Sequence, residues 1–600
     1  MAMLLVGEGD FSFSVSLLQQ TDSKTHGHIV TSSLLTEDEL YALHRNGEEN
    51  IRKIKDAGAK VLFGVDATKL HENENITDLG LFEIVIFNFP HTGGKSNIKK
   101  SRNLLRSFFF SAEKVLAKSG QICVTLVQGQ GGTPADQPMR EWQNSWQIVA
   151  MATDANLILC KTEDFSSSNF PGYSSSGFRS QDKHFHTENA VVHVFERTHL
   201  KVEFDEEANN PSIGRCAIGG QEYMFGKYAT EKIKEINTLI TDEPRHPFNI
   251  IIRRLQDICH RTFCTDIIDI SLPHIIKDGR SETHFRGFTV GQSECGLEQF
   301  HKSIYTEEHS ELACSDFQSV YLRSTLIENL LLGDTEIPEH SKCNMYMGDV
   351  YKWCQVNETD SPVDIEVMAV YRGENIEDSD LESSAKSALQ ELVVEHVEID
   401  YDTNPDSAKM HASLLDIKWT LTRTCSLNNE GSDIDHSSTS SSCENRCLLA
   451  LYGSLKSNPN ITVLIISLMG IAKVLYNVTN SRLLWTTDGR YYEQFASSPP
   501  ALNSSPYSLH PPTWIFDISF WKSEVYTERS FSTLCRDCCG DYLQSVKIID
   551  TFKDDKSDRI SLCYRLVFKS CDKALSYSTA LNLQMILRNE VVKFLSVELR

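Results

Sequence analysis

Residues 5–14, LVGEGDFSFS, decide the fold of the N-terminal part of the chain. The apolar residues 2–6 have the composition of a buried strand, and residues 15–19 have the composition of a helix. A Gly-x-Gly turn between a strand and a helix lets the backbone approach a ligand closely and directs N–H groups towards it. The same pattern also occurs in ordinary tight turns, so the surrounding sequence has to decide between the two.

Strands and helices alternate after this turn. The pattern predicts strands over residues 27–32, 60–65, 82–88 and 121–127, and helices over residues 40–57 and 101–118. Such alternation predicts an open parallel sheet, whose ligands bind at the carboxyl ends of the strands. We therefore expect four polar clusters to converge on one crevice, namely residues 7–10, 31–33, 66–68 and 88–91.

Several phrases of this region occur in an order that resembles a known family. They are residues 5–14, VDAT at 65–68, FNFPHTGG at 87–94, VTL at 124–126 and FPGY at 170–173. Together they resemble the Rossmann-like domain of the large-subunit rRNA uridine-N3 methyltransferases over about residues 2–197. The resemblance implies S-adenosylmethionine as cofactor and N3 of a uracil base as methyl acceptor.

Carried over residue by residue, the resemblance also implies site residues. It places Gly7, Glu8, Gly9, Asp10 and Phe11 at the methionine and ribose parts of the cofactor, and Asp66 and Ala67 near the adenine. It places Asn88, Pro90 and His91 on the acceptor side. By analogy with amino-methylating enzymes, an aromatic residue such as Phe89 would stack on a flipped base.

The chemistry of uracil N3 calls for a proton acceptor. This imide must lose its proton for methylation, and His91 is the best-placed side chain with a pKa near neutrality. Two structural alternatives stay open: His91 caps the turn after the strand, and Asp66 is a helix N-cap. The second strand ends in residues 31–33, TSS, without an acidic residue for the ribose hydroxyls unless Glu37 or Asp38 folds back.

Other candidate residues are less specific. The basic side chains of residues 95–106 fit either RNA-backbone contact or a solvated helix face; they are Lys95, Lys99, Lys100, Arg102 and Arg106. His184, His186 and His193 lie where a last strand pair is expected, and we interpret them as ordinary strand residues. The cysteines near residues 443–447 and 535–539 lack a second ligand pair at zinc-finger spacing, so no metal site is expected.

The last part of the chain predicts a ferredoxin-like βαββαβ fold. Strands are expected over residues 514–520, 544–552, 561–568 and 597–599, and helices over residues 527–538 and 578–595. The phrases PP at 511–512, FDISFW at 516–521, VKIIDTF at 546–552 and CYRL at 563–566 resemble the ferredoxin-fold anticodon-binding domain of phenylalanyl-tRNA synthetases. That resemblance covers about residues 510–600.

The middle of the chain resembles the organellar form of the same synthetase over about residues 244–497. The landmarks are HPFN at 246–249, YLRST at 321–325, GDVYK at 348–352 and RLLW at 482–485. Adenylate formation needs two arginines that contact ATP. The first of the corresponding positions is Lys352, and the second falls near Gly470, where no arginine is available. We therefore expect a structural or tRNA-shape scaffold without aminoacylation activity.

Composition and charge indicate several domains that differ in net charge. Six hundred residues are too many for one hydrophobic core, and 40% apolar with 23% charged residues excludes collagen-like, wholly disordered and disulfide-scaffold chains. The net charge of −24 divides into −4 for residues 1–197, −21 for residues 198–510 and +1 for residues 511–600. The acidic middle is unsuited to coating nucleic acid, whereas the two ends remain compatible with an RNA partner.

No basic presequence opens the chain, and the longest apolar run, residues 463–472, is about half the length that spans a bilayer. We expect a cytoplasmic protein without a membrane association, with the nucleolus as the alternative. The oligomeric state is left open.

These patterns predict a multidomain α/β and α+β protein. We expect a Rossmann-like methyltransferase domain at residues 1–197, a linker at 198–243 and a degenerate class II synthetase-like α+β core at 244–497. A second linker at 498–510 and a ferredoxin-like domain at 511–600 follow. The combination resembles the ferredoxin-fold anticodon-binding domain-containing proteins. It implies an S-adenosylmethionine-dependent RNA methyltransferase whose C-terminal half docks rRNA or tRNA, or alternatively a non-catalytic RNA-binding adaptor.

Overall fold

The computed structural model groups the chain into two compact units. The first comprises Met1–Phe204, Pro506–Trp514 and Lys569–Asn582, and the second comprises the remaining segments. The structure describes residues 1–93, 97–175, 185–199, 213–218, 221–263, 265–269, 275–277, 289–292, 320–333, 335–337, 343–372, 378–393, 400–402, 409–424, 446–496 and 504–600. The predicted domain boundaries stay a prediction.

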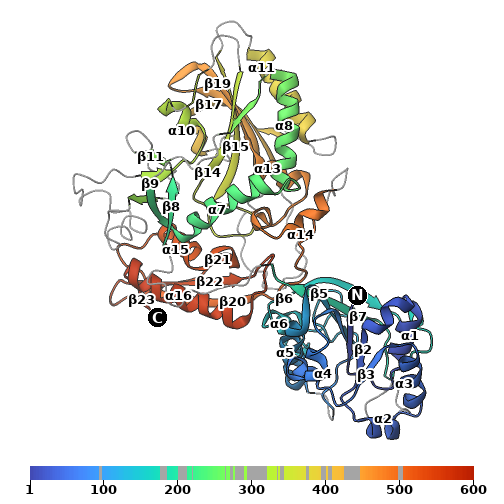
Figure 1. Cartoon of the computed structure of the whole chain (residues 1–600). Coiled ribbons are helices and arrows are strands. Elements are labelled where there is room, and N and C mark those ends of the chain that lie inside the picture. Colours follow the sequence, from blue (N-terminus) through green and yellow to red (C-terminus); the bar gives the residue numbers. More distant parts are fainter. Residues whose placement is uncertain are drawn as a thin grey trace. The chain divides into compact units, whose positions relative to one another are not determined.

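A seven-stranded sheet forms the centre of the first unit (Figure 1). Its strands, in the order β3-β2-β1-β4-β5-β7-β6, are Lys60–Leu62, Ile29–Ser32, Met3–Val6, Phe82–Asn88, Leu116–Leu126, Ala190–Arg197 and Leu157–Phe165. Strands β1 to β5 run parallel, and β7 runs antiparallel to both β5 and β6. The predicted open parallel sheet is confirmed, and the antiparallel β7 distinguishes it from the 3-2-1-4-5-6 order of dinucleotide-binding domains.

Helices cover both faces of this sheet. On one face α1 (Ser12–Gln20) and α3 (Gly47–Asp56) pack on Met3 and Leu5, and on the other α5 (Ile98–Val115) and α6 (Ile148–Thr153) pack on strand residues of opposite parity. The single helix predicted over residues 40–57 is wrong. The α2 helix (Glu37–Leu43) ends early because the chain turns back, and a Cβ at Gly47 would lie only 2.5 Å from Leu40 Cδ2.

A distant segment of the first unit covers the outer edge of the sheet. The Leu509 N–H donates to the Leu159 carbonyl of β6 at 2.7 Å, and the Tyr507 hydroxyl donates to Glu196 of β7 at 2.6 Å. An uncovered edge strand would present unpaired backbone groups to other chains. Residues 506–514 therefore protect this edge. Of the histidines expected in the last strand pair, His193 lies in β7, His186 precedes the strand, and His184 is outside the described residues.

The second unit contains another seven-stranded sheet, which is antiparallel except that β10 runs parallel to β14. Its order is β10-β14-β15-β19-β18-β17-β16, formed by Ile267–Asp269, Cys343–Tyr351, Val363–Arg372, Asn458–Ser467, Arg446–Leu455, Leu415–Thr424 and Asp400–Asp402. Helix α8 (Pro247–Phe263) contacts α11 (Asp378–Val393) and α13 (Leu468–Leu475). A five-stranded sheet, β11-β13-β12-β9-β8, is formed by Ile275–Lys277, Val320–Leu322, Thr289–Gln292, Gln221–Gly226 and Ile213–Ile218, and α7 (Lys227–Asp242) follows β9.

The expected βαββαβ order is confirmed at the C-terminal end. The elements are β20 (Trp514–Trp521), α15 (Glu528–Cys539), β21 (Leu543–Lys553), β22 (Ile560–Phe568), α16 (Tyr577–Leu595) and β23 (Glu598–Leu599), with sheet order β21-β22-β20-β23. Phe520 and Leu566 are buried together with the helix residues Phe531 and Leu587. Strand residues of the opposite parity, such as Trp521 and Arg565, lie on the other face of the sheet.

Candidate functional site

The sheet order of the first unit reverses at β1, which lies between β2 and β4. Ligands of open α/β sheets bind at such a switch point, at the carboxyl ends of the strands. Val6 pairs with Phe87, so the turn after β1 and Asn88 at the end of β4 are neighbours. Gly7 has φ +72°, and a Cβ there would lie 2.5 Å from the Phe87 ring. Only glycine fits this position, and it exposes the backbone to the crevice.

Two carboxylates hold the first turn of α1. Asp10 Oδ1 accepts hydrogen bonds from Ser12 N at 3.0 Å and Ser12 Oγ at 2.7 Å, and Glu8 Oε2 accepts from Ser14 N at 3.2 Å and Ser14 Oγ at 2.8 Å. The side chains are only 8% (Glu8) and 6% (Asp10) exposed. The second oxygen of each makes no hydrogen bond with the described residues, and no described lysine or arginine pairs with either carboxylate.

Burial raises the pKa of Glu8 to about 7. The neighbouring Asp10 contributes to this rise, and the hydrogen bonds from Ser14 oppose it. A helix N-terminus ordinarily attracts anions such as phosphate, because its N–H groups carry a partial positive charge. Here protein carboxylates already occupy that position. The arrangement therefore disfavours a phosphate group and favours a cation or a hydrogen-bond donor in the crevice.

Asn88 lies on the opposite side of the switch point. Its Oδ1 accepts a hydrogen bond from Thr125 Oγ1 of β5 at 2.6 Å, which fixes the orientation of the amide. The Nδ2 atom is buried and has no hydrogen-bond partner among the residues that the structure describes. An unsatisfied buried donor costs about 1–3 kcal/mol, so an atom in this state at the end of a strand points to a missing ligand.

The residues after Asn88 form a tight turn. Pro90 is buried, and Phe89 adopts φ +50°. The Phe89 ring packs against Phe165 at 5.2 Å and Phe185 at 4.9 Å between centroids, so the structure places it among other aromatic rings of the protein.

His91 is exposed, and its Nδ1 accepts a hydrogen bond from the Gly93 N–H at 2.8 Å. This hydrogen bond is the one expected if His91 caps the turn after the strand. It also requires that the neutral imidazole carry its proton on Nε2.

Asp66 and Ala67 lie at the start of the 3₁₀ helix η2 (Ala67–Glu72), beyond the end of β3. Asp66 Oδ1 accepts hydrogen bonds from Thr68 N at 2.9 Å and Thr68 Oγ1 at 2.7 Å. Through this oxygen Asp66 is the N-cap of η2, as the structural alternative predicted. Ala67 is buried in the core beneath it. The adenine-side role of these two residues stays a prediction.

The end of β2 differs from the acidic arrangement that would hold ribose hydroxyls. Ser32 Oγ donates to the Leu5 carbonyl at 2.9 Å. Glu37 accepts a hydrogen bond from the Tyr41 hydroxyl at 2.7 Å, and Asp38 lies exposed in the first turn of α2. Neither acidic residue folds back towards β2.

Three features of the site were missed by the sequence analysis. Ser12 and Ser14 hold the two carboxylates, Thr125 orients Asn88, and the segment 170–175 packs on the glycine turn. Ser174 N donates to Ser12 Oγ at 3.1 Å, and the Phe13 ring lies 4.6 Å from Phe170 and 5.7 Å from Tyr173. The phrase FPGY at 170–173 was the available signal, but it carried no assigned role.

The basic run on α5 is partly structural. Arg102 donates to the carbonyls of Trp142, Gln143 and Ser145, and Arg106 pairs with Asp154 at 2.6 Å. Lys99 and Lys100 are exposed, whereas Lys95 lies outside the described residues. Of the described lysines in this run, both are therefore accessible, and contact with an RNA backbone stays a prediction.

The synthetase-like core uses its cations internally. Arg323 pairs with Asp349 at 2.6 Å, and both side chains are at most 1% exposed. Lys352, at the first arginine position, pairs with Glu366 at 3.3 Å. Burial opposes charge on Glu366, but Lys352 and His411 lower its pKa to about 2. At the second position a Cβ on Gly470 would lie 2.2 Å from the Leu448 carbonyl, so no side chain fits there.

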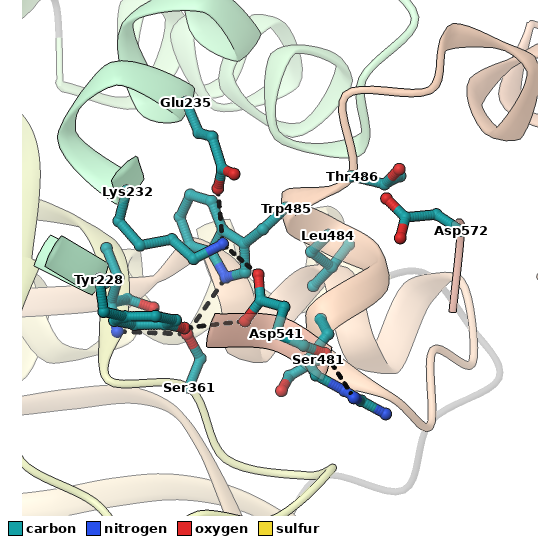
Figure 2. A network of polar contacts seen from close by, with 12 residues as sticks. Tyr228, Lys232, Glu235, Ser361, Ser481, Leu484, Trp485, Thr486, Asp541 and Asp572 are labelled. Atoms are coloured by element: carbon teal, nitrogen blue, oxygen red, sulfur yellow. Dashed lines mark hydrogen bonds and ion pairs between the residues drawn. The ribbon is translucent and has the colours of Figure 1, made fainter. Parts of the chain in front are cut away.

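A second buried cation joins α7 to the turn before β21 (Figure 2). Lys232 is 2% exposed, and its Nζ donates to Glu235 at 2.5 Å and to Asp541. Tyr228 donates to the same Asp541 at 3.0 Å, and nearby Trp485 Nε1 donates to Ser361 at 3.1 Å. This network fixes elements of the second unit to one another.

Metal-binding clusters and membrane-spanning helices are both absent from the described residues. No group of three or more His, Cys, Asp and Glu side chains is arranged to hold a metal ion in the part of the chain that the structure describes. Among the helices described, none is both long and apolar enough to cross a bilayer.

Comparison with known proteins identifies both ends of the chain. Residues 4–177 match the BMT5-like family, described as rRNA (uridine-N3-)-methyltransferase BTM5-like, and residues 510–600 match the ferredoxin-fold anticodon binding domain. Human ferredoxin-fold anticodon-binding domain-containing protein 1 is 28% identical over 99% of both chains. The chloroplastic/mitochondrial phenylalanine–tRNA ligase of Arabidopsis thaliana is 39% identical over 22% of this chain and 30% of its own length.

Among solved structures, the glycopeptide N-methyltransferase MtfA complexed with S-adenosyl-L-methionine covers 33% of this chain and 81% of its own, at 10% identity and a TM-score of 0.21. The two sequence matches confirm the resemblances to both families. The chain thus carries a BMT5-like methyltransferase domain at its N-terminal end and a ferredoxin-fold anticodon-binding domain at its C-terminal end, and it is similar along its whole length to human ferredoxin-fold anticodon-binding domain-containing protein 1.

Proposed function

We propose that the protein is an S-adenosylmethionine-dependent RNA methyltransferase that acts on N3 of a uridine. The observation that carries this proposal is the set of unused polar atoms at the switch point. Among the described residues, Glu8 and Asp10 each leave one carboxylate oxygen without a hydrogen bond, and Asn88 leaves a buried amide nitrogen without one.

The residues of the glycine turn fit S-adenosylmethionine, which when bound supplies a methyl group on a positively charged sulfur. Gly7 lets the backbone approach the ligand, because the Phe87 ring leaves no space for a side chain. Glu8 and Asp10 offer negative charge to a ligand that carries a sulfonium and an ammonium group. The occupied N-terminus of α1 disfavours the pyrophosphate of a dinucleotide.

On the acceptor side, two donors suit the edge of a uracil ring. N3 lies between two carbonyl groups, and its anion is stabilised by hydrogen bonds to those oxygens. Asn88 Nδ2 offers one donor, and the imidazole of His91, three residues further along the turn, is the candidate for a second. We propose that His91 supports loss of the N3 proton as a hydrogen-bond donor, and the general-base role is the alternative.

A methyl-transfer assay tests this proposal. The full chain should transfer labelled methyl groups to RNA, and Asn88→Ala should lower the rate by about a hundredfold, the size expected for losing one donor to a developing anion. Asn103→Ala, at an exposed position of α5, is the matched control and should be silent. Failure of the wild-type protein to bind S-adenosylhomocysteine would refute the proposed methyltransferase activity.

The two roles of His91 are separated by a pair of variants. The amide of His91→Gln can still donate a hydrogen bond, so this variant should keep most of the activity that His91→Ala loses. Equal loss in both variants would favour the general base instead.

We propose that the C-terminal half docks the RNA. The open face of the ferredoxin-like sheet gathers Trp521, Phe552, Arg559 and Arg600, with the Arg559 and Arg600 guanidinium carbons 4.8 and 5.4 Å from the Trp521 ring centroid. Aromatic rings beside cations suit the stacking of single-stranded bases. Ultraviolet cross-linking should therefore place bound RNA on this face.

The substrate and the location are two separate proposals. We propose rRNA, with tRNA as the alternative, and a cytoplasmic location, with the nucleolus as the alternative. Nucleoside mass spectrometry on fractionated RNA from cells lacking the protein decides the first question, and microscopy of the tagged chain decides the second.

A non-catalytic RNA-binding adaptor is the second candidate function. The end of β2 favours it, since Glu37 bonds to Tyr41 and leaves the ribose position without a carboxylate. Such an adaptor would capture RNA without binding S-adenosylhomocysteine.

A further inference from the structure

The segment 170–175 is anchored to the glycine turn although it is distant in the sequence. Ser12 Oγ donates to Asp10 at 2.7 Å and accepts a hydrogen bond from Ser174 N at 3.1 Å, so one hydroxyl joins the turn to the segment. Tyr173 N donates to the Phe170 carbonyl at 3.0 Å and closes a turn within the segment. These bonds fix the backbone on both sides of Tyr173.

Packing fixes the Tyr173 ring as well. It lies edge-on to Phe13 of α1 at 5.7 Å and to Phe165 of β6 at 5.9 Å between centroids. The Tyr173 hydroxyl donates no hydrogen bond to the described residues. A tyrosine whose ring is held on two sides and whose hydroxyl is unused is well suited to contact a ligand.

The electrostatic surroundings keep this hydroxyl protonated. Burial, and then the carboxylates of Glu8 and Asp10, raise the pKa of Tyr173. Tyr173 is therefore a neutral donor within electrostatic range of two acceptors, each of which keeps one oxygen without a hydrogen bond to the described residues. This set of one donor and two carboxylates complements a zwitterionic amino acid, whose carboxylate accepts and whose ammonium donates.

We propose that Tyr173 is a cofactor-binding residue: its hydroxyl donates to the carboxylate at the amino-acid end of the cofactor, and Glu8 and Asp10 receive the ammonium group. This inference rests on the proposed function, because it assumes S-adenosylmethionine in the crevice. It adds that the segment 170–175 forms the part of the site that binds the amino-acid end of the cofactor.

Calorimetry with two ligands tests the proposal on the full chain. S-Adenosylhomocysteine has the amino-acid end, and 5′-methylthioadenosine lacks it. Tyr173→Phe should weaken S-adenosylhomocysteine at least about tenfold, as expected for a hydrogen bond to a charged group, and should leave 5′-methylthioadenosine within about twofold. Ser12→Ala, which removes the anchor of Ser174, should show the same selectivity. Tyr41→Phe removes a hydroxyl that bonds to Glu37 and should change neither affinity.

The possible results separate this inference from the proposed function. Unchanged binding of S-adenosylhomocysteine to Tyr173→Phe, or an equal loss for both ligands, would overturn the role of Tyr173 alone. Absence of binding to the wild-type chain would overturn the proposed function itself. An unchanged melting temperature of ligand-free Tyr173→Phe shows that any loss of affinity is local.

Discussion

The crevice of the first unit and the synthetase-like core of the second both bury carboxylates, but they neutralise them differently. In the core, Asp349 pairs with Arg323 and Glu366 pairs with Lys352. In the crevice, Glu8 and Asp10 are also buried, yet no described lysine or arginine faces them. Burying a charged carboxylate without a compensating cation is costly. The difference teaches that the core supplies its own cations, whereas the described residues of the crevice supply none and a ligand can bring one.

The largest expected effect concerns the core. Arg323→Leu removes the cation and leaves Asp349 buried and uncompensated, so we expect the second unit to lose about 3–5 kcal/mol of unfolding free energy. Denaturant unfolding of the full chain measures this loss, and affinity for S-adenosylhomocysteine should not change. Arg261→Leu breaks an exposed pair with Glu391 and is the control, with an expected loss of about 1 kcal/mol or less. Equal losses in both variants would erase the contrast between the regions.

A smaller effect of opposite sign is expected in the crevice. The folded pKa of Glu8, about 7, exceeds its ordinary value of 4.5. The native state therefore holds an extra proton between these values, and stability is lost as the pH rises through this window, by about 3 kcal/mol.

Glu8→Gln escapes this cost, and its amide oxygen can still accept from Ser14. Thermal unfolding at pH 8 should show a gain of about 1–3 kcal/mol that vanishes near pH 4, together with weaker binding of S-adenosylhomocysteine. Loss of stability at pH 8 would show that the carboxylate is a structural group.

The smallest effect is the pH dependence of ligand binding. If the ionised form of Glu8 receives the ligand's ammonium group, affinity should rise as this carboxylate loses its proton around pH 7. Between pH 6 and pH 7.5 the ionised fraction increases about eightfold, and the association constant for S-adenosylhomocysteine should increase similarly. Calorimetry across this range measures the change. A steep profile that persists in Glu8→Gln would assign the titration to another group.

Local patterns were sufficient to predict the elements that surround the site. The apolar strand before Gly7 and the alternation up to residue 127 predicted the strands β1 to β5 along the chain, because side-chain periodicity reports local structure directly. The break between α2 and α3 was missed although the backbone leaves the helical conformation at His44, with φ −126° and ψ 103°. Helix propensity alone did not locate this change of backbone conformation.

The candidate site was only half predictable. The resemblance assigned Glu8, Asp10 and Asn88 to the site. Which of their polar atoms are already hydrogen-bonded depends on Ser12, Ser14 and Thr125, and only the three-dimensional structure shows those contacts. Tyr173 reaches the turn from a remote part of the chain, and no spacing rule connects the two. Contacts between residues that are distant in the chain are the hardest to predict from a single sequence.

The segment that covers the β6 edge has a consequence for biosynthesis. Leu509 closes an edge whose own residues, around Leu159, leave the ribosome about 350 residues earlier. At ordinary elongation rates this is a delay of about 20 to 70 s. During that interval the nascent N-terminal sheet presents an open strand to its neighbours on the polysome. Chaperone engagement with this stretch should therefore last until the C-terminal segment has emerged.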